Sequence, residues 1–393
     1  MSRWVSVLRW GALAVSLALA IPGIARADVS LGDVGQKEIA DAKPGKILRI
    51  WPQVGGTVGA GKAYRILYRS TGLKDQPIAV SGAIFLPDGP ALRGGRDVIA
   101  WAHPTTGVVG RCAPTLLPDL SGTIPGLEEM LARGYVVAAT DYPGLGTPGA
   151  HPYLVGASEA RSVLDSVRAA RELPDAKAGK RFAVWGHSQG GHAALFTGEA
   201  AKDYAPELTL VGIAAAAPAT YLAELFDADH TTTAGKTLTA MALLSWSKVF
   251  DIPLDSILAA RARPGFETVA RDCIQSIAEM LKIEQDTQGL PTNFLTANPT
   301  TVEPWKSIMA RNAPGQASAG APVFIAQGTA DDIVRPAITK RFADHLCLKG
   351  TRVHMVLLEG ASHSFAGMDS AHTAVAWMAD RFQGRTPPSD CGG

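Results

Sequence analysis

The stretch that decides the fold of this chain is Phe182-Ala183-Val184-Trp185-Gly186-His187-Ser188-Gln189-Gly190, which leads into the alanine-rich segment Gly191–Ala201. The apolar run 182–185 is typical of a buried strand, and the alanine-rich segment predicts a helix. A Gly-x-Ser-x-Gly string by itself often arises by chance. Between a strand and a helix, however, it predicts a sharp turn that presents the serine at the helix N-terminus, where small neighbours leave room and the dipole favours negative charge. Ser188 is therefore the candidate nucleophile.

Short, almost purely apolar runs recur on both sides of this turn. Besides 182–185 they span 98–102, 135–140, 208–216, 323–326 and 353–358. Such runs suit parallel strands buried on both faces. Helical patterns lie between them, for example around Val163, Val167 and Ala170. Two further runs, 64–69 and 78–86, predict an antiparallel pair at the start, so the chain is expected to form a mostly parallel, doubly wound α/β sheet.

One long gap interrupts this alternation. Residues 221–320 separate two successive strands, although a crossover usually needs only about a dozen residues. Within the gap, apolar residues recur at helical spacing: Phe266, Val269, Ala270, Cys273, Ile277, Met280 and Leu281. We expect a helical cap inserted between two parts of the core, 28–220 and 321–393, with these stripes serving mainly as packing surfaces. Ahead of the first strand, the Gly-, Pro- and polar-rich residues 28–62 predict an irregular arm.

A serine hydroxyl needs a base to take its proton and a carboxylate to orient that base. After this type of turn the expected chain order is serine, acid, histidine. His345, His354, His363 and His372 all lie late enough in the chain. Only His363 follows a core strand on a Gly- and Ser-containing loop, where catalytic loops gather. His363 is therefore the candidate base.

The candidate acid lies after the strand 323–326, in Gln327-Gly328-Thr329-Ala330-Asp331-Asp332-Ile333-Val334. The string resembles the Gly-x-x-Asp-x-x-Val pattern that follows this strand in many α/β-hydrolases. That resemblance selects Asp331 and leaves Asp332 as a loop-structuring or capping residue. Which carboxylate faces His363 is left open by the sequence.

An oxyanion intermediate also needs backbone N–H donors, one of them from Gln189, which follows the nucleophile. The second donor is expected in the loop His103-Pro104-Thr105-Thr106-Gly107, which resembles a His-Gly-x-x-Gly loop with proline at the first glycine. Proline has no N–H, so Thr105 is the candidate and Thr106 the alternative. His187 and His192, which flank the Ser188 turn, are interpreted as packing residues.

The chain begins with features of an export signal. Residues 1–27 combine Arg3 and Arg9, an apolar run from Gly11 to Ile21 and small residues at 25–27. Since this run is shorter than a membrane span and is followed by Pro22-Gly23, we expect a cleaved signal peptide, no stable membrane anchor afterwards, and a secreted or periplasmic protein.

Composition excludes several classes of function. The chain has 393 residues, 47% hydrophobic and 19% charged, with a net charge of +1, which suits a globular enzyme. Scattered lysines and arginines make a nucleic-acid partner unexpected. No metal-binding spacing or cofactor motif is found, so neither metal nor cofactor is expected. Cys112, Cys273, Cys347 and Cys391 predict two disulfides in an exported protein. Spacing leaves three pairings open, although Cys391 could pin the C-terminal tail to Cys347 and leave Cys112 for Cys273.

Taken together, these motifs predict the α/β-hydrolase fold, and the chain resembles the secretory lipase family of the lipase A type, as a bacterial member. The most specific stretches are Tyr64–Ser70, Ala79–Gly82, Tyr142–Gly146 with His151–Val155, and the Ser188 motif. The resemblance implies hydrolysis of carboxylic esters, often lipid esters at a lipid–water interface, beneath a helical cap, and disulfides compatible with the pairing above. The chain departs from the family at His187, where tyrosine is common, and at Pro104. A serine exopeptidase and a catalytically inactive binding protein remain alternatives.

Overall fold

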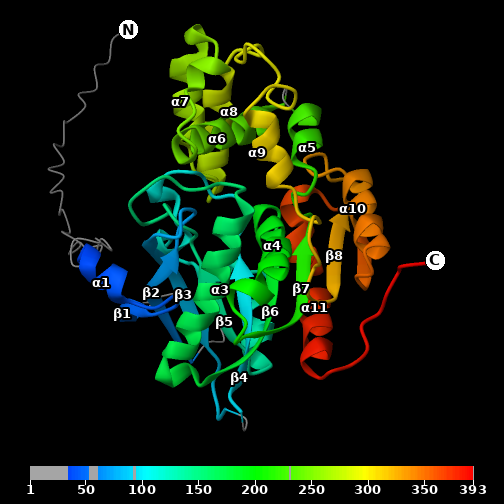
Figure 1. Cartoon of the computed structure of the whole chain (residues 1–393). Helices are drawn as coiled ribbons and strands as arrows, with labels where there is room; N and C mark the ends of the chain where they lie inside the picture. The colour runs from blue at the N-terminus through cyan, green and yellow to red at the C-terminus, as the bar shows by residue number, and fades with distance from the viewer. Residues whose placement is uncertain (1–33, 53–60, 92–93, 230–231, 393) are drawn as a thin grey trace, which may run out of the picture. The chain divides into compact units, whose positions relative to one another are not determined.

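The computed structural model describes residues 34–52, 61–91, 94–229 and 232–392 (Figure 1). The signal peptide expected over residues 1–27 lies outside these ranges. No helix in the described ranges is long and apolar enough to cross a membrane.

A single sheet of nine strands runs through the described part of the chain. The strands are β1 Ile47–Pro52, β2 Lys62–Thr71, β3 Pro77–Leu86, β4 Arg96–Ala102, β5 Val136–Thr140, β6 Ala178–His187, β7 Thr209–Ala216, β8 Val323–Gly328 and β9 Val353–Leu358. Their order across the sheet is β1-β2-β3-β5-β4-β6-β7-β8-β9. The last six strands in this order pair in parallel, and β1, β2, β3 and β5 pair antiparallel. The predicted parallel sheet with an opening antiparallel pair is confirmed.

Helices cover both faces of this sheet (Figure 1). They are α1 Gln36–Asp41, α2 Leu127–Ala132, α3 Gly156–Glu172, α4 Gln189–Tyr204, α5 Leu222–Asp229, α6 Thr233–Val249, α7 Arg263–Ala270, α8 Ile277–Gln288, α9 Trp305–Arg311, α10 Pro336–Leu348 and α11 His363–Phe382. One apolar core joins α3, α4 and α10 to the sheet, with Val163, Leu195 and Phe342 among its members. The other joins α2 and α11 through residues such as Met130 and Trp377.

The register of the parallel strands brings their carboxyl ends to one edge. Ala102 at the end of β4 pairs with Gly186 on β6. His187 on β6 pairs with Ala216 on β7, and Ala216 pairs with Ala326 on β8. The loops that follow β4, β6, β8 and β9 therefore emerge side by side, which is where ligands bind in open α/β sheets.

The arm ahead of β2 is more regular than the sequence predicts. It contains α1 and the edge strand β1, which pairs antiparallel with β2. In β1 only Leu48 is buried, so the segment lacks the continuous apolar run that marks the central strands. Val34, Ile39 and Leu48 instead form a small separate cluster against Leu67 and Ala79.

The residues between β7 and β8 are mainly helical, as the apolar spacing predicts, and form α5 to α9. Their core includes Trp246, Phe266 and Trp305, all fully buried. The predicted apolar stripe divides into two helices, α7 and α8. Phe266, Val269 and Ala270 of α7 are buried, whereas Ile277, Met280 and Leu281 of α8 are exposed.

Two disulfides join distant parts of the chain. Cys112 pairs with Cys273 and Cys347 with Cys391, each with a Cα–Cα distance of 5.3 Å. Of the three pairings that spacing left open, the structure contains the one that ties the C-terminal tail to α10. The other disulfide joins the loop after β4 to the segment between α7 and α8.

Candidate active site

Ser188 occupies a strained turn between β6 and α4. Its backbone has φ 57° and ψ −116°, a conformation that residues other than glycine rarely adopt. A side chain at Gly186 would collide with the carbonyl oxygen of Gly190, and one at Gly190 with that of Ala102. Only glycine fits at these two positions. The close packing places Ser188 at the sheet edge, directly beside the loop after β4.

A continuous hydrogen-bond chain connects Ser188 to His363 and Asp331. His363 Nε2 lies 2.8 Å from Ser188 Oγ, and His363 Nδ1 lies 2.9 Å from Asp331 Oδ2. Because the carboxylate accepts, Nδ1 carries the proton and Nε2 is left to accept the serine proton. The three residues come from the ends of β6, β8 and β9, so the structure brings together the three candidates from sequence.

The Asp331 carboxylate is held by further donors. It is buried, and Oδ1 accepts the backbone N–H groups of Ile333 at 3.0 Å and Val334 at 2.8 Å. Oδ2 also accepts from Gln327 Nε2 at 3.1 Å. Asp332 is exposed to solvent. The structure therefore turns Asp331, and not Asp332, toward His363.

The other late histidines have partners away from Ser188. His345 on α10 bonds the carbonyl of Gly315, His354 on β9 bonds Asp390, and His372 on α11 bonds Glu129. None of these three histidines bonds Ser188 or Asp331. Their positions agree with the interpretation that they have structural roles.

Two histidines that the sequence marked as packing residues have specific partners. His187 is buried and its Nε2 donates to the carbonyl oxygen of His363 at 2.9 Å. His192 is fully buried, with Nδ1 2.6 Å from Glu159 Oε2 and Nε2 2.7 Å from the carbonyl oxygen of Asn312. No local motif signals these contacts, because the partners lie 33 to 176 residues away in the chain.

The two candidate oxyanion donors belong to different segments: Gln189 directly follows Ser188, and Thr105 bonds Tyr153, which lines the pocket at Ser188. Gln189 is the first residue of α4, and Thr105 lies in the loop after β4 that packs against Gly190. Among the described residues, the N–H groups of Gln189 and Thr105 form none of the backbone–backbone hydrogen bonds found in turns, loops and helix caps. The Thr105 hydroxyl is 2.9 Å from the hydroxyl of Tyr153, which anchors the loop to the chain that enters α3.

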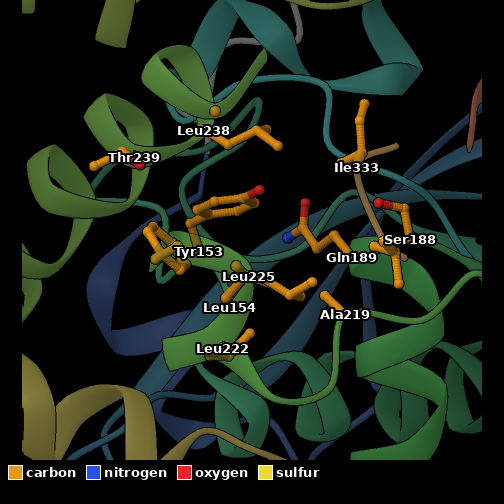
Figure 2. A pocket seen from close by; sticks show the side chains of 13 residues that line it. Tyr153, Leu154, Ser188, Gln189, Ala219, Leu222, Leu225, Leu238, Thr239 and Ile333 are labelled. Carbon is orange, nitrogen blue, oxygen red and sulfur yellow. The ribbon is translucent and has the colours of Figure 1, made fainter. Parts of the chain in front are cut away.

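A narrow pocket of about 50 Å³ adjoins Ser188 (Figure 2). Its walls are mostly apolar and come from the core and from α5 and α6. The lining residues are Tyr153, Leu154, Ser188, Gln189, Ala219, Leu222, Leu225, Phe226, Gly235, Leu238, Thr239, Ile333 and Val334. The segment between β7 and β8 thus forms one side of the pocket at the serine.

The site contains no arrangement suited to a metal ion. Within the described ranges, no cluster of three or more His, Cys, Asp or Glu side chains could hold one. The available chemistry is that of a serine hydroxyl, an imidazole, a carboxylate and backbone N–H groups.

The turn that carries Ser188, the chain order Ser188, Asp331, His363 and the mostly parallel sheet are typical of the α/β-hydrolase fold, and comparison with known proteins identifies the family. Residues 124–390 match the secretory lipase family model, and the chain belongs to that family. It is 26% identical to Lipase A of Arthroderma benhamiae over 84% of this chain and 72% of the relative. It is 24% identical to a protein of Mycobacterium tuberculosis named a probable inactive lipase, over 82% of this chain and 74% of that one.

Solved structures agree on the fold. Candida antarctica lipase A superposes with a TM-score of 0.75 at 18% identity, covering 91% of this chain and 86% of that one. At this identity the likeness shows a shared fold. Residues 124–390 include Ser188, Asp331 and His363, so the whole hydrogen-bond chain lies within the family match.

Proposed function

We propose that this protein is a secreted carboxylic ester hydrolase in which Ser188 is the nucleophile, His363 the base and Asp331 the residue that orients it. The observation that carries the proposal is the unbroken chain Asp331–His363–Ser188, with bonds of 2.9 and 2.8 Å. Such a chain activates a hydroxyl that is otherwise a weak nucleophile. The family assignment supports hydrolysis of an ester as the reaction.

The reaction proceeds in two steps. His363 takes the Ser188 proton while Oγ attacks the ester carbonyl, and the resulting oxyanion accepts hydrogen bonds from the N–H groups of Gln189 and Thr105. The imidazolium then gives its proton to the leaving alcohol, and an acyl-enzyme remains. Water, deprotonated by His363, attacks the acyl group and releases the acid and free Ser188.

The substrate is an ester with an apolar portion. Apolar side chains from α5 and α6 line the pocket at Ser188 and would accept an acyl chain. A pocket of about 50 Å³ is small for such a chain, so residues 221–320 act as a cap that moves to admit it. On this assignment, the two parts of the chain on either side of the cap, residues 28–220 and 321–393, make up the α/β-hydrolase core.

Export fits this assignment. The family is named for secreted enzymes, and both disulfides suit an oxidising compartment. We infer that residues 1–27 are removed as a signal peptide. N-terminal sequencing of the exported protein would show a start near residue 28, and retention of residues 1–27 would contradict the inference.

The test is hydrolysis of p-nitrophenyl esters of increasing acyl length by the wild type and by Ser188→Ala. We expect the substitution to lower kcat by a factor of about 10³ or more. Asp332→Asn is the matched control, because that carboxylate is exposed and lies outside the hydrogen-bond chain. Undiminished turnover by Ser188→Ala would overturn the assignment.

Two further readouts separate the alternatives. Faster hydrolysis of aminoacyl arylamides than of esters would indicate an exopeptidase. A folded protein that a fluorophosphonate probe fails to label would indicate an inactive relative, as one family member's name suggests for that protein.

A further inference from the structure

The side-chain amide of Gln189 has a different environment at each end. Its Nε2 donates to Glu159 Oε1 at 2.8 Å and lies 3.3 Å from His151 Nε2. Its Oε1 is buried and has no hydrogen-bond partner among the described residues, although Gln189 lines the pocket at Ser188. The unpartnered atom is therefore a buried carbonyl oxygen on a residue that lines the candidate active site.

The partners on the other side fix which end of the amide faces the pocket. Glu159 Oε1 already accepts the backbone N–H of Leu154 at 3.2 Å, so the amide atom facing it must be the donor. Rotation of the amide by 180° would place Oε1 against this carboxylate oxygen.

His151 imposes the same orientation. Its Nδ1 lies 2.9 Å from the carbonyl oxygen of Pro143, which can only accept, so Nδ1 carries the proton. Burial lowers the pKa of His151 to about 4, which keeps the ring neutral. The other ring nitrogen, Nε2, is then an acceptor for the Gln189 NH₂ group.

The anchoring residues are themselves rigidly held. Glu159 is fully buried, and its second oxygen bonds His192 at 2.6 Å. His192 in turn bonds the carbonyl of Asn312 at 2.7 Å. Gln189 therefore cannot easily turn Oε1 toward another partner within the protein.

The pocket wall near Oε1 is otherwise largely apolar. Figure 2 shows the Gln189 oxygen and the Tyr153 hydroxyl directed toward the same space, bordered by Leu238 and Ile333. The Tyr153 hydroxyl is already bonded to Thr105 at 2.9 Å. A ligand that enters this space thus comes close to Gln189 Oε1, an acceptor to which no group of the described residues donates a hydrogen bond.

We propose that the pocket selects esters that carry a hydroxyl group a few bonds from the ester carbonyl, and that Gln189 Oε1 accepts the hydrogen bond from that hydroxyl. This rests on the proposed function, since Gln189 follows the nucleophile and its backbone N–H faces the reacting carbonyl. Both the N–H group and Oε1 belong to Gln189. The short distance between them therefore limits how many bonds separate the ester carbonyl from the hydroxyl of the substrate. The hydroxyl belongs either to the acyl group, as in a hydroxy-acid ester, or to the alcohol, as in a glycerol monoester.

Two matched pairs of substrates test the proposal and distinguish the sources. One pair is methyl 3-hydroxybutyrate and methyl butyrate, and the other is glycerol 1-butyrate and propyl butyrate, all followed by acid release in a pH-stat. We expect kcat/KM for the hydroxylated member of one pair to exceed its partner's by about tenfold or more, because a buried carbonyl gains its missing bond. Ratios near one in both pairs would overturn the proposal.

A variant pair shows whether Gln189 is responsible. Gln189→Met keeps the length of the side chain and removes the acceptor, so we expect the ratio between hydroxylated and plain ester to fall toward one. The ratio is the readout, whatever happens to the overall rate. Leu225→Met, a substitution in the same pocket, is the control and leaves the ratio unchanged. A full wild-type ratio in Gln189→Met would overturn the proposal.

Binding provides a readout that does not need turnover. Calorimetry on Ser188→Ala with the preferred pair should show tighter binding of the hydroxylated ester by about tenfold. Equal binding of both members would overturn this inference. Turnover that depends on Ser188 but shows no preference would overturn this inference alone and leave the proposed ester hydrolase intact.

Discussion

Nε2 of His187 lies 2.9 Å from the carbonyl oxygen of His363, and the two imidazole rings are 5.1 Å apart. A carbonyl oxygen only accepts, so His187 donates. The bond joins the residue before Ser188 to the first residue of α11, which carries the candidate base. His187 thus fixes the position of His363 relative to Ser188 through the His363 backbone.

We therefore predict that His187→Phe lowers kcat about tenfold with little change in KM, because the ring site stays filled while one buried hydrogen bond is lost. His187→Gln, whose amide can still donate to the His363 carbonyl, should recover most of the rate. Steady-state kinetics on a p-nitrophenyl ester would measure both. Equal kcat values for His187→Phe and the wild type would contradict a positioning role.

Buried histidines also make the fold sensitive to acid. Burial lowers the pKa of His187 to about 3 and that of His151 to about 4, below the value of about 6.5 for an unfolded histidine. Below pH 6.5 the unfolded chain binds protons that these folded residues do not bind. The contribution of these two neutral histidines to the free energy of unfolding is therefore fully present above pH 6.5. It is lost as the pH falls toward 4 for His151 and toward 3 for His187.

Between pH 6.5 and its lowered folded pKa, each such histidine should reduce the free energy of unfolding by about 1.4 kcal/mol for each unit by which the pH falls. We predict that urea unfolding of His187→Gln between pH 6 and pH 4 has a slope smaller than the parent's by about that amount. Comparing the two proteins cancels groups that titrate in both, such as Asp141, whose pKa burial raises. Identical slopes would show that His187 is not kept neutral by burial.

The two adjacent aspartates offer a direct comparison. Asp331→Asn should lower kcat by a factor of about 10³ to 10⁴, because an amide cannot stabilise the imidazolium form of His363 or select its tautomer. Asp332→Asn should leave kcat within about twofold of the wild type, since surface changes of this kind rarely matter. Circular dichroism would confirm that Asp331→Asn remains folded despite its bonds to Ile333 and Val334. Comparable losses in both variants would reject the choice of Asp331.

The strands of the core were predictable because each is a short apolar run, and that pattern follows from burial on both faces. Strand β1 lacks this pattern, since it is an edge strand with only Leu48 buried. The available signal was the apolar pairs Ile47-Leu48 and Ile50-Trp51 on either side of Arg49, but neighbouring Gly and Pro residues favoured a loop. The division of the apolar stripe into α7 and α8 was equally hidden, because Ile277, Met280 and Leu281 continue the helical spacing of α7 although they are exposed.

In the candidate site, too, some residues could be predicted from local sequence and others could not. Ser188 and His363 were accessible from local sequence because each lies at a recognisable junction after a strand. Asp331 needed a family pattern, since nothing local separates it from Asp332. The bonds of His187, of His192 with Glu159 and of Gln189 arise from tertiary packing between residues far apart in the chain. Such pairings depend on side-chain direction, which one sequence does not encode locally.

The two disulfides should differ in reactivity and in their effect on stability. The Cys112–Cys273 bond spans 161 residues and Cys112 is fully buried, whereas Cys347–Cys391 spans 44 residues near the C-terminus and is partly exposed. Loop-closure entropy predicts a loss of about 5 kcal/mol on removing the first and about 4 kcal/mol on removing the second. Urea unfolding of Cys112→Ala/Cys273→Ala and Cys347→Ala/Cys391→Ala would measure this. Mild dithiothreitol followed by alkylation and mass spectrometry should label Cys391 before Cys112, and the reverse order would contradict the burial argument.

The exposed apolar residues of α8 lead to a prediction about the physical state of the substrate. Ile277 is 79% exposed and Leu281 68%, and with Met280 they form one face of the helix. Exposed apolar groups on a helix can enter a lipid surface and gain hydrophobic free energy there. We predict that Ile277→Ser/Leu281→Ser lowers activity on emulsified triglyceride about five- to tenfold, because about 1 to 1.4 kcal/mol of surface binding is lost.

The same double variant should hydrolyse a soluble short-chain ester at the wild-type rate, because neither side chain lines the pocket at Ser188. Leu348→Ser is the matched control, since Leu348 on α10 is 88% exposed but stands outside the α8 face. It should leave both activities unchanged. Equal losses on emulsion and soluble ester would indicate damage to the fold, and no loss on the emulsion would show that the α8 face does not contact lipid.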